Sequence, residues 1–508
     1  MLAKVHSAAL HGIDAHPVEV EVHLGSGDLR FVIVGLPDAA VRESQDRVRA
    51  ALTHSGFAVP QGHITVNLAP AELRKEGPSF DLPIALGLLA ASDQLRAPGL
   101  ADFVMLGELA LNGMLRPVRG VLPVALRAAG DHRAALIVPT GNAAEAAVVR
   151  DIKVYAVGSL REAADLLEGR IQPSPHTVDT HRLFDHSDDG APDMAEVKGQ
   201  ESAKRALEIA AAGGHNLLLI GPPGTGKSML AKRLPAILPP LTLGEALETT
   251  RIHSVAGLLE TGHALVTRRP FRSPHHTSSD AGLLGGNAQP SPGEISLAHN
   301  GVLFLDELPE FRRSVLETLR QPLEDGRVTI SRAAGTMTFP ARFMLVAAMN
   351  PTPDGKMPTE SASSPRDIQN YLGRISGPLL DRIDLHLELA PVKFRDLSAA
   401  AAGESSESIR DRVIAARTRQ LARFRSSASV VCNAHMGPRE LRACCALDAA
   451  AAGLLQAAME ELRLSARAHD RILKVARTIA DLADAENLSA DDVAEAVQYR
   501  SLDRQIWS

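Results

Sequence analysis

The chain has 508 residues, a formal net charge of −6 and 22% charged residues. Its length exceeds one ordinary hydrophobic core, so we expect two to four domains of a globular protein. The acidic balance excludes a nucleic-acid-binding surface spread over the whole molecule, and any such site must be a local patch. Aromatic residues make up 3% of the chain, which argues against binding by stacking of bases on exposed rings.

The three cysteines are Cys432, Cys444 and Cys445. They have neither metal-ligand spacing nor the number that a disulfide framework needs. This usage is typical of a reducing cytosol, so we expect a cytoplasmic protein. We expect no membrane span, because no apolar run approaches ~18 residues, and the first residues lack the apolar core of a signal peptide.

The first 170 residues predict an α/β domain with its own core. Residues 18–24 alternate apolar and polar side chains, as a half-buried strand does. Asp38 is placed to cap a helix over 39–55, which Gly56 ends. A second helix follows residue 83. Further strands are expected at 31–36, 64–68 and 135–139.

A linker is expected from residue 171 to 195, because this stretch is rich in Pro, His, Asp and Ser and nearly free of apolar periodicity. His176, His181 and His186 recur along it. A metal site is one interpretation of these histidines, and solvated linker side chains are the other, which the composition favours.

A glycine-rich loop with a lysine stands near the middle of the chain. Residues 221–228 are Gly221, Pro222, Pro223, Gly224, Thr225, Gly226, Lys227 and Ser228, which fit G-x-x-x-x-G-K-[ST]. An apolar run precedes the loop and a helical stretch follows it. In this context backbone N–H groups and the helix N-terminus bind phosphate. Lys227 then reaches the β- and γ-phosphates and Ser228 offers its hydroxyl to Mg²⁺, so the sequence predicts a site for ATP and Mg²⁺.

A second motif consists of an apolar strand at 302–305 followed by Asp306 and Glu307. Buried strands that end in acids are common, so the motif is weak alone and becomes strong downstream of a P-loop. We expect Asp306 to hold Mg²⁺ through its water shell. Glu307 is expected to orient and polarise the attacking water.

A third buried strand, at 343–349, ends in Asn350. Asn350 fits a first sensor, a polar side chain that helps to place the attacking water near the γ-phosphate. The alternative is a turn asparagine that precedes Pro351. The order of the motifs along the chain favours the sensor.

Arg382 fits an arginine finger, which is presented to the ATP of a neighbouring subunit and stabilises charge on its γ-phosphate. The alternative is a local salt bridge with Asp381 or Asp384. A finger implies a ring, because the site is completed only at an interface between subunits.

Four further segments carry a resemblance to a known family. They are 199–200 with 210–216, 271–277, 292–299, and the segment around Arg382. Over nearly its whole length the chain resembles the ComM/YifB family of magnesium-chelatase-like AAA+ ATPases. The resemblance implies a homo-oligomer, a hexameric ring, that works on DNA as a helicase and drives branch migration in natural transformation. The motifs alone indicate a ring-forming ATPase.

The front domain resembles Lon-type proteases, with Ser79 in the segment that carries their catalytic serine. Leu122 stands where the resemblance requires the catalytic lysine. A Ser–Lys dyad needs that lysine as its base. We therefore expect a Lon-like domain that is no peptidase and serves assembly or DNA contact.

Two insertions belong to this family branch, at 270–298 and at 328–339. The second predicts a β-hairpin. Hairpins of this kind point into the pore of a ring, where Arg332 is placed to contact a DNA backbone. The alternative is an ordinary surface arginine. Relatives commonly carry two cysteine pairs between the first sensor and the finger, whereas residues 350–373 contain none, so we expect no zinc.

The C-terminal part is expected to be an all-helical lid, with helices at 409–424, 446–462, 466–483 and 490–499. The first of these is the most basic run in the chain; nucleic-acid contact and a solvated helix face both explain it, and we favour the second. The resemblance places the second sensor, which reaches the γ-phosphate from the lid, at Arg467. Arg471 lies on the same helix face at i+4 and fits equally well.

The fold class predicted is α/β: a Lon-protease-like domain over 1–170, a linker over 171–195, an AAA+ core with a parallel sheet over 196–395, and a helical lid over 396–508. The alternatives to a DNA motor are a magnesium-chelatase-type motor subunit, an ATP-dependent protease and an ATP-gated scaffold. Leu122 opposes the protease. The front domain opposes the chelatase motor, and the complete set of ATPase motifs opposes the scaffold.

Overall fold

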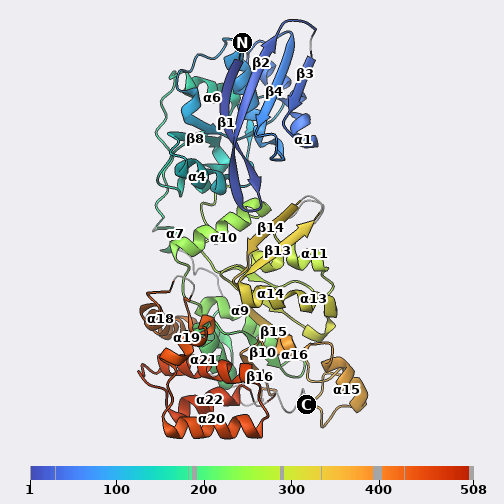
Figure 1. Ribbon diagram of the computed structural model, residues 1–508, viewed down its shortest axis with the longest axis vertical. Helices are drawn as coiled ribbons and strands as arrows, with labels where there is room; N and C mark the ends of the chain where they lie inside the picture. Colours follow the sequence, from blue (N-terminus) through green and yellow to red (C-terminus); the bar gives the residue numbers. More distant parts are fainter. Residues whose placement is uncertain are drawn as a thin grey trace. The chain divides into compact units, whose positions relative to one another are not determined.

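The computed structural model describes residues 2–28, 30–180, 182–185, 192–286, 291–332, 335–392, 403–427, 430–500 and 502. It separates into two compact units (Figure 1). The first comprises residues 1–186 and 243–267, and the second comprises 187–242 and 268–508. Among the described residues, no helix is both long and apolar enough to cross a membrane.

The first unit is built on a seven-stranded sheet in the order β3-β4-β2-β1-β5-β8-β9. Its strands are β1 (Leu2–His11), β2 (Asp14–Gly25), β3 (Arg30–Val34), β4 (His63–Ala69), β5 (Phe103–Met105), β8 (Ala135–Pro139) and β9 (Lys153–Val157). The strands β1 and β2 form a long antiparallel hairpin, and β5, β8 and β9 run parallel. A separate two-stranded sheet joins β6 (Glu108–Leu109) to β7 (Leu115–Arg116).

Helices cover this sheet. They are α1 (Ala39–Arg42), α2 (Ser44–His54), α3 (Asp81–Ala91), α4 (Val121–Gly130), α5 (Ala143–Ala147) and α6 (Leu160–Leu167). The Asp38 carboxylate accepts from the N–H of Val41 at 2.8 Å, which confirms the predicted cap. The helix expected over 39–55 is broken at Glu43 into α1 and α2. Helix α3 lies close on the sheet at Gly87, where a Cβ would stand 2.7 Å from Val22.

One segment of the first unit comes from the middle of the predicted ATPase core. Residues 243–267, which include α10 (Leu243–Ala256), pack with the front of the chain. Ser254 donates a 2.5 Å hydrogen bond to the buried Glu145, and Arg251 pairs with Asp14. Burial raises the pKa of Glu145, while the hydrogen bond from Ser254 opposes that rise. The structure thus differs from the predicted division at this segment; the other bounds remain predictions.

The second unit is built on a five-stranded sheet in the order β11-β12-β15-β10-β16. Its strands are β11 (Phe271–Arg272), β12 (Val302–Leu305), β15 (Met344–Met349), β10 (Leu217–Ile220) and β16 (Leu385–Glu388). Every neighbouring pair is parallel. The strands β10, β12 and β15 are wholly buried, which is why their sequences are continuous apolar runs.

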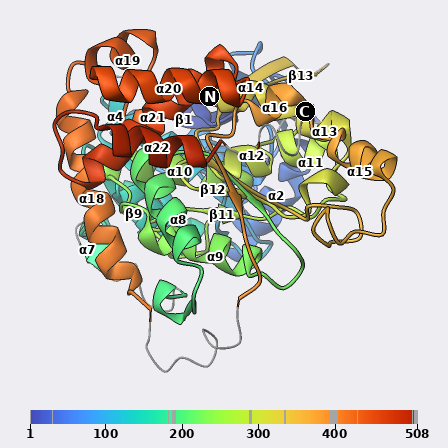
Figure 2. The ribbon, with the colours of Figure 1, turned by 90° about the horizontal axis from the view of Figure 1, so that it is seen from below.

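The sheet and the C-terminal helices share one hydrophobic core. The helices α18 to α22 are drawn in orange to red in Figures 1 and 2. Helices α8 and α9 connect the sheet with the C-terminal helices: α18 packs against both, and α21 packs against α8. Their bounds are α8 (Glu201–Gly213), α9 (Lys227–Ile237), α18 (Ser406–Arg423), α19 (Pro438–Cys444), α20 (Ala449–Glu461), α21 (Ala466–Leu482) and α22 (Ala490–Gln498).

Short elements complete the chain. They are α7 (Arg182–Asp185), α11 (Asp280–Leu284), α12 (Glu294–Leu297), α13 (Arg313–Thr318), α14 (Arg320–Asp325), α15 (Pro365–Leu372), α16 (Gly377–Leu380) and the antiparallel hairpin of β13 (Arg327–Arg332) and β14 (Gly335–Pro340). The hairpin confirms the prediction for 328–339. The mixed α/β class, the parallel sheet and the C-terminal helical region are also confirmed.

Candidate functional site

The glycine-rich loop lies between the end of β10 and the start of α9. Gly224 and Gly226 have φ angles of 81° and 89°, a left-handed conformation in which only glycine is unstrained. A Cβ at Gly224 would meet nothing within 4 Å. The backbone of the loop is therefore open to a ligand, and α9 begins directly behind it, as a phosphate site requires.

Lys227 bonds to its own loop. Its Nζ donates to the carbonyls of Gly221 at 2.6 Å and Pro222 at 3.0 Å, and to Asn350 Oδ1 at 3.2 Å. Burial lowers the pKa of Lys227, and the charge of Asp306 opposes that effect. The ammonium thus has neutral acceptors that phosphate oxygens can replace.

Ser228 and Asp306 meet at the same edge of the sheet. The Ser228 hydroxyl donates to Asp306 Oδ2 at 2.6 Å. Asp306 follows β12 and Asn350 follows β15, and the order β12-β15-β10 brings both to the loop. A hydroxyl and a carboxylate are oxygen ligands that suit Mg²⁺. This pair, beside a phosphate-binding loop, fits a magnesium–nucleotide complex.

The Glu307 side chain contacts a residue outside this pair. It has a φ of 52°, its N–H donates to Asp306 Oδ1 at 3.0 Å, and its side chain is 57% exposed. Its Oε2 lies 3.2 Å from His276 Nδ1. His276 belongs to none of the ATPase motifs, and its place in the segment 271–277 is the signal that the sequence offers for it.

Gln200 is a second residue whose role the motifs do not reveal. It precedes α8 with a φ of 58°. Its side-chain amide donates to the carbonyls of Ala390 at 2.8 Å and Thr225 at 3.3 Å. Gln200 therefore connects the glycine-rich loop to the chain that leaves β16.

Arg382 lies at the opposite, amino edge of the sheet, between α16 and β16. It is 6% exposed and pairs with Glu324, and its Nη1 donates to the carbonyl of Pro378 at 2.5 Å. Asn216, directly before β10, donates to the Arg382 carbonyl at 3.0 Å. The acid that pairs with the Arg382 side chain is thus Glu324, and not Asp381 or Asp384, the two that the sequence suggested for a salt bridge.

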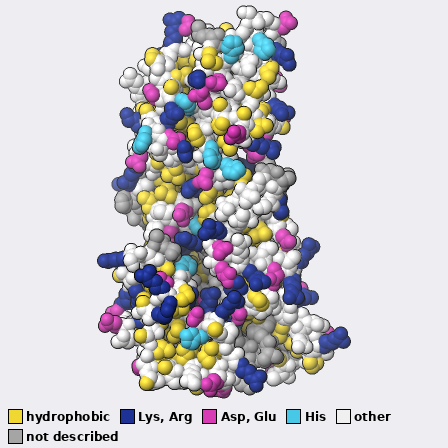
Figure 3. Space-filling model, in the orientation of Figure 1, with side chains coloured by type: hydrophobic (Ala, Val, Ile, Leu, Met, Phe, Trp, Pro, Cys, Tyr) yellow, Lys and Arg dark blue, Asp and Glu magenta, His cyan; other side chains and the backbone are white. Residues whose placement is uncertain are grey.

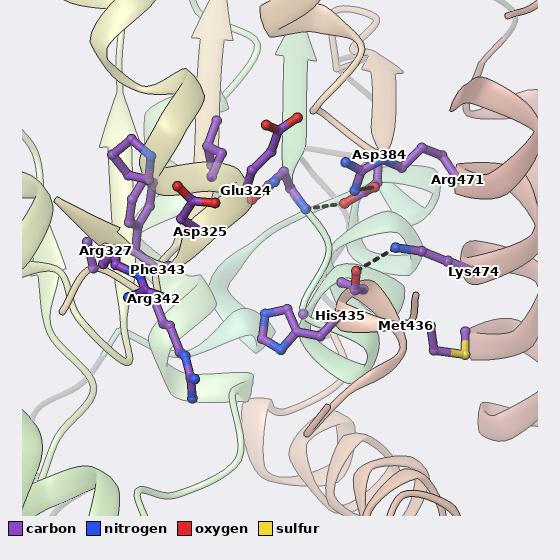
Figure 4. Close-up of a pocket in the computed structure, with 17 residues that line it drawn as sticks. Glu324, Asp325, Arg327, Arg342, Phe343, Asp384, His435, Met436, Arg471 and Lys474 are labelled. Carbon is purple, nitrogen blue, oxygen red and sulfur yellow. Dashed lines mark hydrogen bonds and ion pairs between the residues drawn. The ribbon is translucent and has the colours of Figure 1, made fainter. Parts of the chain in front are cut away.

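Arg467 and Arg471 begin α21 at this same edge. Arg471 bonds to Asp384 at 2.6 Å, whereas Arg467 is 63% exposed and 3.9 Å from Asp381. Burial would raise the pKa of Asp384, but Arg471, His215 and the N–H of Asn216 hold it well below its usual value. Arg471 and Asp384 line a cavity of about 470 Å³, and Figure 4 shows both side chains among the residues around it.

The two edges are one strand apart. The four residues of β10 span about 13 Å at ~3.3 Å per residue. Within the described residues, the ion pairs of Arg382, Arg467 and Arg471 are with acids at the amino edge and not with residues 221–228. Their assignment as finger and second sensor remains a prediction.

The front unit has no base at the position predicted for the catalytic lysine. Leu122 is fully buried in α4, and its N–H donates to Glu145 at 2.8 Å. Ser79 lies in a short 3₁₀ turn, and its carbonyl accepts from Gly107 at 2.9 Å. That the unit is no peptidase remains a prediction.

Arg332 is exposed at the end of β13, paired in register with Gly335. The turn at 333–334 lies outside the described residues. On the face in Figure 3, Lys and Arg side chains of the second unit stand among acidic ones. A DNA contact by Arg332 is therefore local and remains a prediction.

Residues 350–373, where we expect no zinc, include a loop that the carboxylate of Asp354 crosslinks by hydrogen bonds. Asp354 accepts from Thr352 Oγ1 at 2.7 Å, Ser361 Oγ at 2.8 Å and Ala362 N at 2.9 Å. These hydrogen bonds keep the pKa of Asp354 well below its usual value. Over the described part of the chain, no three His, Cys, Asp or Glu side chains are grouped to hold a metal ion.

Comparison with known families identifies three segments. The model described as "Magnesium chelatase, subunit ChlI" matches residues 193–397. "Subunit ChlI of Mg-chelatase" matches 20–142, and "Magnesium chelatase, subunit ChlI C-terminal" matches 403–500. Together with the parallel sheet and the loop at its carboxyl edge, these matches define a magnesium-chelatase-like AAA+ fold.

Individual relatives extend the similarity to the whole chain. It is 47% identical over 506 residues to "Competence protein ComM" of Haemophilus influenzae and to "Uncharacterized protein YifB" of Salmonella typhimurium, covering 99% of this chain and 98% of each relative. The "Magnesium-chelatase 38 kDa subunit" of Rhodobacter capsulatus is 28% identical over 230 residues, 39% of this chain and 62% of the relative. The chain belongs to the ComM/YifB family.

Proposed function

We propose that this protein is an ATP-driven motor that acts on DNA during natural transformation. One observation supports the ATPase part of the proposal: at one edge of the sheet Lys227 donates a hydrogen bond to Asn350, and the adjacent Ser228 donates one to Asp306. The proposed role in natural transformation is supported by the relative named as a competence protein, which this chain matches over nearly its full length.

In this proposal the chain's own residues bind and orient the triphosphate. The loop N–H groups and Lys227 bind phosphate oxygens, and Ser228 and Asp306 hold Mg²⁺, which supplies charge neutralisation. Asn350 helps to place the attacking water near the γ-phosphate. Glu307 orients the attacking water and accepts its hydrogen bond once its carboxylate leaves His276.

A ring of identical subunits completes the site. Arg382 lies a strand length from the loop of its own chain, so we propose that it serves the loop of a neighbour. A head-to-tail contact, which a closed ring repeats, brings the amino edge of one sheet to the carboxyl edge of the next. Arg382 then exchanges Glu324 for a phosphate. We propose six subunits, and we place Arg467, which is more exposed than Arg471, at the same junction.

DNA passes the β13–β14 hairpin in this proposal. Arg332 contacts the backbone rather than the bases, which suits a motor that must move along any sequence. Branch migration of recombination intermediates, with helicase activity, is the task that we propose for the ring. The front unit serves assembly or DNA contact.

The test compares unwinding of forked, four-way and linear duplex DNA, with ATP and with a non-hydrolysable analogue. We expect ATP-dependent displacement, fastest on a branched substrate, and none with the analogue. Lys227→Ala is the matched control, because it removes the phosphate-binding cation and leaves the hairpin intact. ATP hydrolysis without displacement on any of the three substrates would refute the proposal.

The second candidate is a motor subunit that serves metal insertion into a porphyrin. The names of all three family models favour it. Since the match at 20–142 carries the chelatase name, the front domain no longer separates the candidates. The share of the chain that each relative matches does separate them: the Rhodobacter capsulatus chelatase subunit matches 39% of this chain, and the competence protein matches 99%. ATP turnover that no DNA stimulates would favour this candidate.

A further inference from the structure

A second cavity of the second unit, with a volume of about 330 Å³, lies on the face of the sheet that α9 does not cover. Ile220 of β10 and Glu388 of β16, which are partners in the strand register, line it from the sheet. Leu219 and Leu387, the residues before them, belong to the hydrophobic core that includes α9. Because side chains alternate along a strand, Ile220 and Glu388 point to the other face.

The facing wall of this cavity comes from the chain that follows Asn350. Pro351, Met357 and, on α15, Ile368 and Leu372 line it. Pro351 and Leu372 are buried, whereas Met357 and Ile368 are half-buried. The wall is therefore apolar and keeps surface that a further apolar group can cover.

The chain returns to this cavity at its far end. Tyr499 accepts a hydrogen bond of 2.9 Å from the N–H of His386 in β16, and Arg500 Nη1 donates to the carbonyl of Ile383 at 2.5 Å. Leu502, the last described residue, is 6% exposed and lines the cavity. The backbone that follows therefore starts from a point fixed beside the cavity.

The sequence beyond Leu502 supplies large apolar side chains. Residues 503–508 lie outside the described residues, and they include Arg504, Ile506 and Trp507. Trp507 is five residues from Leu502, so its Cα lies within about 18 Å of that residue. An indole ring and an aliphatic side chain suit an apolar cavity of this size. The charge of Arg504 is complementary to that of Glu388, the charged residue of the described lining.

The covalent connection favours this segment over a free partner. A separate molecule that binds the cavity loses translational and rotational freedom. A segment that is already attached beside the cavity has a high effective concentration there and avoids most of that loss. The occupant that fits both the apolar lining and the position of Leu502 is thus part of the same chain.

We propose that the segment 503–508 docks the side chains of Ile506 and Trp507 in this cavity and holds the 351–372 stretch against the sheet. The cavity also touches Gly221, the first residue of the glycine-rich loop. A Cβ at Gly355 would stand 3.0 Å from Pro223 of that loop, so the stretch that the segment holds packs on the nucleotide site. This inference goes beyond the proposed function, since it requires neither DNA nor ATP hydrolysis.

The first test uses the fluorescence of the full-length protein, because Trp507 is the only tryptophan in the chain. We expect its emission to be shifted to the blue relative to the urea-unfolded protein and to be shielded from acrylamide. Ile368→Glu places a charge in the apolar cavity, and both effects should be lost. Gln369→Glu is the matched control, because it adds the same charge to the next residue of α15, which does not line the cavity.

The second test measures trypsin cleavage after Lys356, which is exposed in the 351–372 stretch. Cleavage reports how often a segment opens locally. Trp507→Ala should speed it about tenfold, the change in equilibrium that loss of one large buried side chain supports. Trp507→Phe keeps an aromatic ring and should retain most of the protection. This comparison does not depend on whether Ile368→Glu folds.

A third test separates the chain's own segment from that of a neighbouring copy. A small amount of wild type is mixed with an excess of the double variant Ile368→Glu, Trp507→Phe, whose cavity is blocked and which has no tryptophan. Docking within one chain predicts that the blue shift persists. Its loss on mixing would show that the segment docks on a neighbour and would overturn the proposal.

Three other results would also overturn it. In the first, Trp507 of the folded wild type emits as in the unfolded protein. In the second, the blue shift survives in folded Ile368→Glu. In the third, Trp507→Ala and the wild type are cleaved after Lys356 at the same rate.

Discussion

The two edges of one parallel sheet differ in how their polar residues are arranged. At the carboxyl edge, Lys227 bonds to loop carbonyls and to Asn350, and Ser228 bonds to Asp306, contacts that a nucleotide can replace. At the amino edge, Arg382 and Arg471 are each paired with an acid of the same chain. The first edge is built to receive a ligand. At the second edge the arginines stay in ion pairs within their own chain, and in our proposal a neighbouring subunit replaces the partner of Arg382.

The largest effect is expected from Arg382→Ala, which breaks the amino edge. If the finger acts on a neighbour, ATP turnover should fall about a thousandfold, while ATP binding persists. Mixing this variant with Lys227→Ala should restore part of the activity, because some interfaces then carry an intact loop and an intact finger. Glu324→Gln is the matched control: it removes the partner, keeps the guanidinium and should stay active. Mixtures that remain inactive would refute action between subunits.

Glu307→Gln breaks the carboxyl edge without removing phosphate contacts. The amide no longer acts as an acceptor of the same strength for water, so turnover should fall at least a hundredfold. Binding of a fluorescent ATP analogue should match the wild type. Near-normal turnover would remove the water-positioning role of Glu307.

Variants of Arg467 and Arg471 separate a role in stability from a role in ATP turnover at the amino edge. Arg471→Ala leaves the buried Asp384 without its guanidinium and should cost about 3 kcal/mol in the free energy of unfolding. Arg467→Ala should change that free energy by less than about 0.5 kcal/mol and lower turnover. Denaturant unfolding and ATPase assays of both variants separate the stabilising arginine from the sensor. Equal losses of stability would contradict this division.

The stability difference for Arg471→Ala should also depend on pH. Asp384 has a lowered pKa in the folded state, so its pairing stabilises the fold above the unfolded pKa of ~3.9. That contribution is lost as pH falls below this value. Unfolding curves at pH 7 and pH 3 should therefore differ less between variant and wild type at the lower pH.

The smallest effect concerns metal. We expect elemental analysis of the purified protein to find no stoichiometric zinc, since residues 350–373 contain no cysteine and Asp354 already crosslinks that loop by hydrogen bonds. Treatment with a chelator should leave the melting temperature unchanged. One zinc per chain would contradict this interpretation.

Sequence patterns predicted the carboxyl edge well for a physical reason. Buried parallel strands are apolar runs, so the apolar run before the glycine-rich loop and the run at 302–305 coincide with β10 and β12. The glycine loop carries its own conformational requirement, which the φ angles of Gly224 and Gly226 confirm.

The contacts that patterns missed depend on tertiary structure. The pairing of His276 with Glu307 follows from β11, a strand of two residues, which is too short to give a periodic signal. Glu324 is distant in sequence from Arg382, so the local carboxylates were the only partners that sequence suggested. The break of 39–55 at Glu43 and the packing of 243–267 with the front unit likewise leave no periodic trace.

The position of residues 243–267 has a consequence for dissection of the protein. The chain passes between the two units at 186–187, again at 242–243 and again at 267–268. A protease that cleaves only near residue 186 leaves the two units connected by the intact chain at 242–243 and at 267–268. A fragment that stops there also lacks the hydroxyl of Ser254 that Glu145 uses, so autonomous expression of the front piece requires the α10 segment to be grafted back.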